Sequence, residues 1–218
     1  MLVACWAAKG GSGTTVVAAS LALTLARRHE REVTLVDLAG DAPAALGVAD
    51  PRGPGVAEWS RAGADVPAAA LAALRTAAGP IGLIHRGQGS LVEADGERLA
   101  VALGLAGMTV VDCDLVSADG HGSEAAVALA SGATHSLLVM RPCFLSLRSA
   151  LAAPLRPSGV VLVHDQVRAL KRVDVEEVLG VPVRAEVTWD PAVARAVDAG
   201  LLATALPAAL SKSLRRAA

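Results

Sequence analysis

Seven short runs of apolar residues recur along this chain, and they restrict its fold more than any other feature. Each run is rich in Val, Leu or Ala and is bounded by Gly, Pro or Asp. The runs are short and largely apolar throughout, which is typical of strands buried on both faces of a sheet. The runs are residues 2–7, 33–38, 81–85, 108–113, 135–140, 159–164 and 183–187.

Helical patterns separate these runs. Regular alternation of strand and helix predicts the α/β class, with a doubly wound, mostly parallel sheet of about seven strands and helices on both faces. Gly/Pro clusters at 51–55 and 154–159 fit loops within this rhythm, so we expect one domain over residues 1–218. The expected helices are 14–29, 56–62, 66–78, 91–106, 122–132, 144–153, 172–179 and 191–216.

Composition excludes several other classes of protein. Apolar residues make up 53% of the 218 residues, which excludes a disordered chain. Twenty basic and 21 acidic residues give a net charge of −1, so no overall basic excess indicates nucleic acid or anionic lipid. Cys5, Cys113 and Cys143 are odd in number and far apart, unlike a disulfide scaffold. No basic segment precedes the first apolar run, so we expect a cytoplasmic protein.

A glycine-rich loop, Ala8 to Thr15, joins the first predicted strand to a long helix pattern. Glycines let the backbone turn tightly and present its N–H groups, and the helix N-terminus adds partial positive charge, so this loop can cradle phosphate. The Thr15 hydroxyl would either ligate Mg²⁺ or cap the helix. A glycine-rich turn without a ligand is the alternative.

The loop resembles the signature of the ParA/MinD family of P-loop ATPases, in the SIMIBI class, whose deviant Walker motif reads Lys-Gly-Gly-x-Gly-Lys-Ser/Thr. The resemblance extends over about residues 2–205. It implies ATP or ADP bound with Mg²⁺, and a face-to-face homodimer in which Lys9 reaches the nucleotide of the partner as a catalytic contact. The implied nucleotide-binding residues are Lys9, Gly10, Gly11, Ser12, Gly13, Thr14 and Thr15.

Position 14 departs from the family pattern, because Thr14 stands where the motif has its second lysine. That lysine normally makes a charge-assisted contact with the β- and γ-phosphates, worth about 1.5–3 kcal/mol. Threonine donates a hydrogen bond but has no charge. The resemblance therefore implies a degenerate nucleotide site.

Two aspartates follow in the order of the family motifs. Asp37 matches the first Asp of a V-D-x-D segment, which helps to hold the Mg²⁺ shell, and Asp112 ends a run like the Walker B strand. The resemblance implies that Thr15, Asp37 and Asp112 hold the Mg²⁺ ion, mostly through its bound waters. Ala39 replaces the second Asp, which orients the attacking water; Asp41 is a candidate catalytic substitute. Considered alone, Asp112 would be a loop cap or turn residue.

Later segments also resemble the family. Ser136–Pro142 is similar to a strand ending in V-x-x-P, and His164 stands where the family has an Asn that reads adenine. His164 would either hydrogen-bond a base edge, cap a helix or face solvent. The family ending near adenine contains a proline, and Thr188 replaces it here.

By resemblance, we expect a nucleotide-switched dimer that positions a larger machine, with weak or absent ATP hydrolysis. Machines of this family include pilus and secretion assembly (TadZ/CpaE-like), septum-site placement and chromosome partition. One alternative is a pseudo-ATPase scaffold that binds no nucleotide and works by protein–protein contact. Another is a normal ATPase that uses Asp41.

Two weaker patterns concern a surface on which such a protein acts. Residues 201–216 are apolar on one side and basic at the end, which fits either peripheral contact with the inner face of the membrane or a last helix packed on the sheet. Arg168, Lys171 and Arg172 form a basic cluster that fits either non-specific DNA binding or a solvated face.

Overall fold

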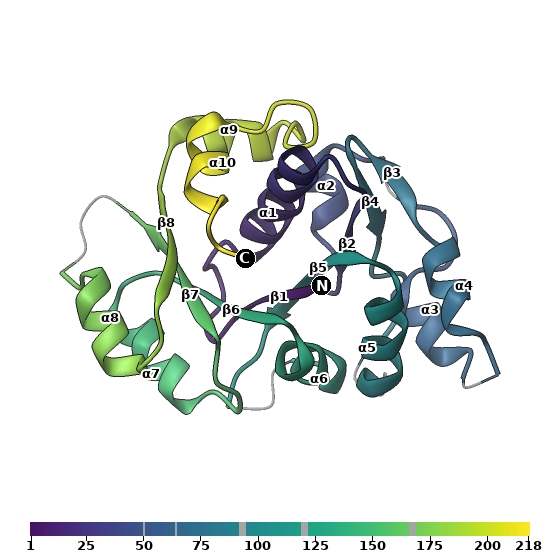
Figure 1. Ribbon diagram of the computed structural model, residues 1–218, viewed down its shortest axis with the longest axis horizontal. Coiled ribbons are helices and arrows are strands. Elements are labelled where there is room, and N and C mark those ends of the chain that lie inside the picture. The colour runs from purple at the N-terminus through teal and green to yellow at the C-terminus, as the bar shows by residue number, and fades with distance from the viewer. Residues whose placement is uncertain (50, 64, 92–94, 119–121, 166–168) are drawn as a thin grey trace.

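The structure, a computed structural model, describes residues 1–49, 51–63, 65–91, 95–118, 122–165 and 169–218. Its strands form one sheet in the order β3-β4-β2-β5-β1-β6-β7-β8, with helices on both faces (Figure 1). The strands are β1 (Leu2–Ala7), β2 (Val33–Asp37), β3 (Thr76–Ala78), β4 (Ile81–Ile84), β5 (Met108–Leu115), β6 (His135–Met140), β7 (Gly159–His164) and β8 (Val183–Thr188).

Strand β1 occupies the centre of the sheet, where it pairs in parallel with β5 on one side and β6 on the other. All six residues of β1 are buried, as are all residues of β2 and β4. This burial on both faces is the reason that these segments read as continuous apolar runs. The seven predicted strands are confirmed, and every pairing among them is parallel.

The helices form two layers. One layer, α1, α2, α9 and α10, packs on one face, and α3 to α8 pack on the other (Figure 1). The long helix α1 buries eleven of its sixteen residues. The helices are α1 (Thr14–His29), α2 (Ala42–Leu46), α3 (Val56–Arg61), α4 (Ala68–Ala73), α5 (Gly96–Leu105), α6 (Glu124–Gly132), α7 (Phe144–Ala152), α8 (Arg172–Leu179), α9 (Pro191–Asp198) and α10 (Ala208–Leu214).

The core is built from Ala, Val and Leu, with Trp6 as its largest fully buried side chain. The indole N–H of Trp6 donates to Ser136 Oγ at 3.0 Å, so the polar atom of this ring is satisfied inside the core. Cys5 and Cys113 lie on the neighbouring strands β1 and β5, but they belong to clusters on opposite faces of the sheet. Both thiols are free, as expected.

The helix predicted over 66–78 is wrong at its C-terminal end. Helix α4 ends at Ala73, and Thr76–Ala78 form β3, an antiparallel edge strand paired with β4. A two-residue turn at Gly79-Pro80, with Gly79 at φ 62°, reverses the chain. The alanine-rich sequence favours a helix, and the hydrogen bonds gained at the sheet edge override that propensity.

The single helix predicted over 191–216 is also wrong. The chain forms α9 and α10 separately, with Gly200 in the left-handed region at φ 63° and Pro207 preceding α10. Gly200 packs directly against Gly47, the C-cap residue of α2. The sequence pattern did not predict this short helix. In the part of the chain that the structure describes, no helix has the length and apolar character needed to cross a membrane.

We expect Gly47→Ala to destabilise the fold by about 2–4 kcal/mol in urea unfolding. Gly47 has φ 74°, and an added Cβ would overlap the carbonyl oxygen of Gly200. Gly180→Ala is the matched control: Gly180 has φ 68°, but no heavy atom lies within 4 Å of its would-be Cβ. Its cost should be about 1 kcal/mol. Equal losses in the two variants would contradict the close packing of α2 on Gly200.

Candidate functional site

The loop between β1 and α1 owes its shape to two left-handed glycines. Gly11 has φ 74° and Gly13 has φ 86°. An added Cβ at either position would meet nothing within 4 Å, so backbone conformation and not packing requires glycine there. Ser12 Oγ donates to the Lys9 carbonyl at 2.7 Å and closes the loop. Left-handed residues of this kind occur in backbone concavities that bind anions.

Helix α1 begins at this loop with its N–H groups open. Gly13 is the N-cap, no side chain among the described residues caps the helix, and the first turn has no acidic residue. The partial positive charge of a sixteen-residue helix is therefore available to an anion. Lys9 is exposed beside it, whereas Thr14 is only 8% exposed.

Asp37 and Asp112 lie directly opposite each other at the carboxyl ends of β2 and β5, and both are fully buried. Asp37 Oδ1 accepts from the Gly40 N–H at 2.7 Å, and Oδ2 accepts from the Ala42 N–H at 3.1 Å. Burial raises the pKa of Asp37 above its usual value, although these N–H groups oppose the shift. Asp37 therefore fixes the loop that leads from β2 into α2.

Asp112 is the least satisfied carboxyl group of the site. Burial raises its pKa to about 7; the nearby Thr15 hydroxyl opposes that shift, and the charge of Asp37 adds to it. Oδ1 accepts from the Asp114 N–H at 3.2 Å, whereas buried Oδ2 has no hydrogen-bond partner among the described residues. A partnerless carboxyl oxygen beside a threonine hydroxyl fits the oxygen ligands that a hydrated Mg²⁺ takes.

The described residues contain no cluster of three His, Cys, Asp or Glu side chains that could hold a metal by itself. Mg²⁺ at nucleotides does not require such a cluster, since the ion keeps several waters and binds substrate phosphates together with one or two carboxylates.

The position expected to orient an attacking water carries only a methyl group. Ala39 is half-buried in the loop that follows β2. Asp41 is exposed at the start of α2, and its side chain caps nothing within the described ranges.

A cavity of about 330 Å³ lies between the glycine-rich loop, α1 and the end of β8. Its wall at β8 includes Thr188 and Trp189, and Val16, Val17 and Val193 contribute apolar surface. Trp189 is 48% exposed, so an aromatic face is open to a ligand. Apolar walls beside an anion-binding loop fit a flat ring attached to phosphate groups.

His164 ends β7, and its side chain turns toward β8. Nε2 of His164 lies 3.0 Å from Glu186 Oε2, and His164 is not among the residues that line the cavity. Its role as an adenine reader stays a prediction. Sequence reasoning did not assign Trp189 to the site; the signal that could have found it is its place immediately after β8, at the carboxyl edge of the sheet.

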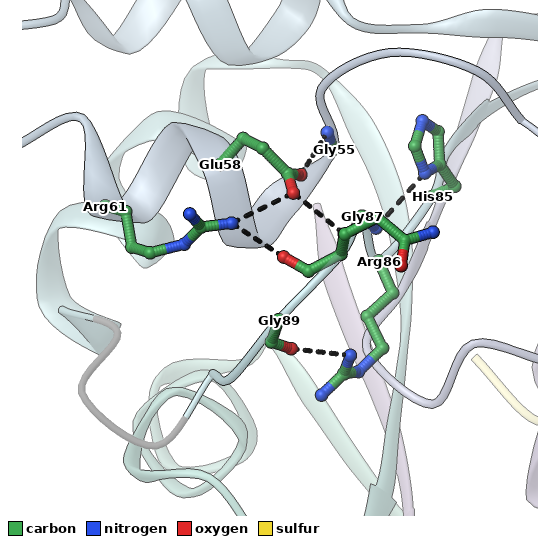
Figure 2. Close-up of polar contacts among 8 residues, drawn as sticks. Gly55, Glu58, Arg61, His85, Arg86, Gly87 and Gly89 are labelled. Atoms are coloured by element: carbon green, nitrogen blue, oxygen red, sulfur yellow. Dashed lines mark hydrogen bonds and ion pairs between the residues drawn. The ribbon is translucent and has the colours of Figure 1, made fainter.

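Glu58, in α3, holds the loop that follows β4 (Figure 2). Its carboxylate accepts from the N–H groups of Gly55 and Gln88, each at 2.8 Å, and from the Arg61 guanidinium at 3.0 Å. Although burial opposes the shift, these donors lower the pKa of Glu58. A Cβ at Gly87, whose φ is 80°, would overlap the Glu58 carboxylate, so the network requires glycine there.

This loop presents Arg86 to the end of β2. Arg86 Nε donates to the Leu38 carbonyl at 3.1 Å. Figure 2 shows the second contact, in which Arg86 Nη1 donates to the Gly89 carbonyl at 2.8 Å. Together with Ala39 and Asp114, Arg86 lines a second cavity of about 470 Å³ at the carboxyl ends of β2 and β5. No motif marks Arg86, so sequence reasoning missed it.

The structure describes most of the two surface patterns singled out in the sequence, the C-terminal stretch 201–216 and the basic cluster of Arg168, Lys171 and Arg172. The apolar side chains of α10, Leu210 and Leu214, are buried in the core, so this helix does not present an apolar face outward. Arg172 is paired with Glu176 at 3.0 Å and lies 3.7 Å from Glu186. Arg168 lies outside the described residues.

Comparisons with known proteins agree with this geometry. The structure is similar to a ParA family ATPase from Chlorobium tepidum TLS (21% identity, 98% of this chain and 95% of that chain, TM-score 0.77). It is also similar to the cell division ATPase MinD from Pyrococcus furiosus (20% identity, 99% of this chain and 95% of that chain, TM-score 0.77). A third match is the septum site-determining protein MinD complexed with Mg-ADP from Pyrococcus horikoshii OT3 (18% identity, 99% of this chain and 94% of that chain, TM-score 0.75).

A comparison with curated protein sequences gives no significant match. The family model described as the CobQ/CobB/MinD/ParA nucleotide binding domain matches residues 3–203. That match spans the glycine-rich loop, both buried aspartates and the cavity at Trp189, and the sheet and helices have the ParA/MinD P-loop fold. The chain therefore belongs to the CobQ/CobB/MinD/ParA nucleotide-binding domain family.

Proposed function

We propose that this protein binds ATP or ADP with Mg²⁺ at the loop of residues 9–15 and uses the nucleotide as a switch for dimerisation. One observation carries the proposal: among the described residues no side chain caps the N-terminus of α1, and beside it lie Thr15 and the Asp112 oxygen that accepts no hydrogen bond. Phosphate requires N–H donors of the kind that the first turn of α1 offers, and Mg²⁺ requires an oxygen ligand of the kind that Asp112 offers.

Each part of the site has a separate task in this proposal. The loop N–H groups and the α1 N-terminus bind the phosphates, Thr15 and Asp112 contact the hydrated metal ion, and Asp37 keeps the β2 loop in place. Bound Mg²⁺ would neutralise phosphate charge. The base would occupy the cavity at Trp189. Lys9 is exposed and therefore free to reach the nucleotide of a partner protomer.

Hydrolysis should be slow. Phosphoryl transfer depends on charge stabilisation and on the position of the attacking water. Thr14 supplies no cation and is nearly buried, and Ala39 supplies no carboxylate to orient water. Asp41 is exposed at the start of α2 and is the remaining candidate for that task.

A nucleotide-dependent dimer of this kind would position a larger assembly in the cytoplasm. The similarity to a septum site-determining protein supports this step. Pilus or secretion assembly, septum-site placement and chromosome partition are the machines that we propose, with a protein partner, and a membrane surface or DNA as a further contact.

A second candidate is a scaffold that keeps the fold without binding nucleotide. The observation that favours it is the state of Asp37 and Thr14: both oxygens of Asp37 already accept hydrogen bonds from backbone N–H groups, and Thr14 is only 8% exposed. Direct measurement of nucleotide binding separates the two candidates.

Titration with Mg-ATP or Mg-ADP should quench the fluorescence of Trp189, because this indole lines the base cavity and is 48% exposed. Trp6 and Trp59 are 0% and 3% exposed, so they report little. The Trp189→Phe variant should lose the signal but keep binding by calorimetry, since an aromatic face remains. Absence of calorimetric heat up to about 1 mM nucleotide would contradict the switch and favour the scaffold.

Ala39→Asp should increase the rate of phosphate release from ATP about tenfold or more, because it restores a carboxylate where water is oriented. Ala39→Asn is the matched control, with the same shape and no charge, and should leave the slow rate unchanged. If Asp41→Ala instead abolishes a wild-type turnover of about 1 per second or more, the expectation of slow hydrolysis is wrong.

Asp112→Asn should change how stability depends on pH in buffer free of metal and nucleotide. Because burial raises the pKa of Asp112 to about 7, the native state holds this proton more tightly than the unfolded chain does. Its contribution to stability is complete below the unfolded pKa and is lost as the pH rises through 7. In urea unfolding, the free energy of unfolding of the Asn variant relative to that of wild type should therefore increase by about 2 kcal/mol from pH 5 to pH 8. Parallel profiles would contradict the raised pKa.

A further inference from the structure

A positive charge without a carboxylate partner borders the cavity of about 470 Å³ at the carboxyl ends of β2 and β5. The guanidinium of Arg86 donates to the carbonyls of Leu38 and Gly89. Across the residues that the structure describes, no Asp or Glu lies within ion-pair distance of it. Neutral carbonyls do not cancel its charge, and a guanidinium has further N–H groups to donate. This half-buried cation therefore fits an anion that enters the cavity.

The protein holds Arg86 in one place through its main chain. The Ala57 N–H, in the first turn of α3, donates to the Arg86 carbonyl at 2.9 Å. The preceding carbonyl, that of His85, accepts from the Val56 N–H at 3.0 Å. Nδ1 of His85 accepts from the Gly87 N–H at 3.1 Å (Figure 2). A side chain whose backbone is fixed in this way loses less conformational entropy when it binds a ligand.

The cavity beside Arg86 lies next to both parts of the candidate site. Leu38 and Cys113, which line it, directly follow the two buried aspartates in the chain. Leu115 also lines it and pairs with Ala7, the last residue of β1 before the glycine-rich loop. An anion held by a metal ion at the aspartates and by the loop is therefore bordered by this cavity.

The order of the strands gives a bound nucleotide a direction across the sheet. The cavity at Trp189 lies at β8, on one side of β1, and the cavity at Arg86 lies at β5, β2 and the loop after β4, on the other side. The glycine-rich loop leaves β1 between the two cavities. With the base at Trp189 and the phosphates along the loop, the phosphate farthest from the base is the one on the side of Arg86.

On the basis of the nucleotide binding proposed above, we infer that Arg86 contacts the terminal phosphate of ATP and makes the site select ATP over ADP. The planar guanidinium matches the geometry of phosphate oxygens. Its charge takes the place of the cation that Thr14 does not supply. Because ADP lacks the terminal phosphate, it gains nothing from Arg86. The contact supplies affinity and does not orient an attacking water, so hydrolysis stays slow.

A purely structural role for Arg86 is the alternative. Its contacts with Leu38 and Gly89 join the loops that follow β2 and β4. Asp114 also lines the cavity, but its carboxylate is exposed, and water screens its effect on an anion there. Loss of a structural contact would weaken the binding of ATP and ADP alike, whereas loss of a phosphate contact affects ATP alone. The ratio of the two affinities therefore separates the two roles.

The test is calorimetric titration with Mg-ADP and with the Mg²⁺ complex of the β,γ-imido analogue of ATP, which is not hydrolysed during the measurement. Arg86→Met should raise the Kd of the ATP analogue about tenfold or more and change that of ADP by less than about twofold, because only the charge-assisted contact with the terminal phosphate is lost. Arg86→Lys keeps the charge without the planar donors, so it should lose less affinity than Arg86→Met.

Arg61→Met is the matched control. Arg61 contacts Glu58 and the Gln88 carbonyl behind the same loop and carries the same charge, but it does not line the cavity. Its replacement should leave the ratio of the two Kd values as in wild type. Normal ADP binding shows that Arg86→Met is folded. If it is not, Arg86→Gln, which keeps N–H donors without the charge, should show the same selective loss.

The outcomes distinguish this inference from the proposed nucleotide site. Wild-type affinities in Arg86→Met, or an equal loss for both nucleotides, overturn the role of Arg86 and leave the nucleotide site in place. The same selective loss in Arg61→Met also overturns it, because that arginine does not reach the cavity. A wild-type protein that binds neither nucleotide contradicts the nucleotide site itself and, with it, the role of Arg86.

Discussion

Burial of β1 on both faces at the centre of a parallel sheet is the constraint on which the rest of this molecule depends. Because these strands run parallel, their carboxyl ends meet at one edge of the sheet, and the glycine-rich loop leaves β1 at that same edge. Asp37 and Asp112 are adjacent for this reason. Their shared burial then raises both pKa values, and it leaves one Asp112 oxygen without a partner among the described residues.

The strands inside the sheet were predictable from sequence, since burial on both faces imposes a largely apolar run. The edge strand β8 was also predicted, although only alternate residues of it are buried. The edge strand β3 was not, because Thr76–Ala78 are alanine-rich and have the same local preference as the helix before them. The division between α9 and α10 depends on the contact of Gly200 with Gly47, and no local pattern contains that long-range contact.

In the candidate site, too, the residues that local sequence marks differ from those that only tertiary packing brings together. Lys9, Thr15, Asp37 and Asp112 could be predicted as candidates because motif order and strand ends mark their positions in the sequence. The cavity at Trp189 and the Arg86 loop are formed by segments far apart in the chain, so their assembly depends on tertiary packing. His164 ends its strand at the expected place, but its side chain is drawn to Glu186 on the next strand.

The junction of Gly47 with Gly200 links the two ends of the site mechanically. Gly47 caps the helix that follows the Asp37 loop, and Gly200 follows the helix that borders the Trp189 cavity. Backbone touches backbone there, and the Leu202 N–H donates to the Ala45 carbonyl at 3.3 Å, so no compressible side chain separates the two segments. We therefore expect a displacement of the loop that follows β2 to move the segment that borders the Trp189 cavity as well.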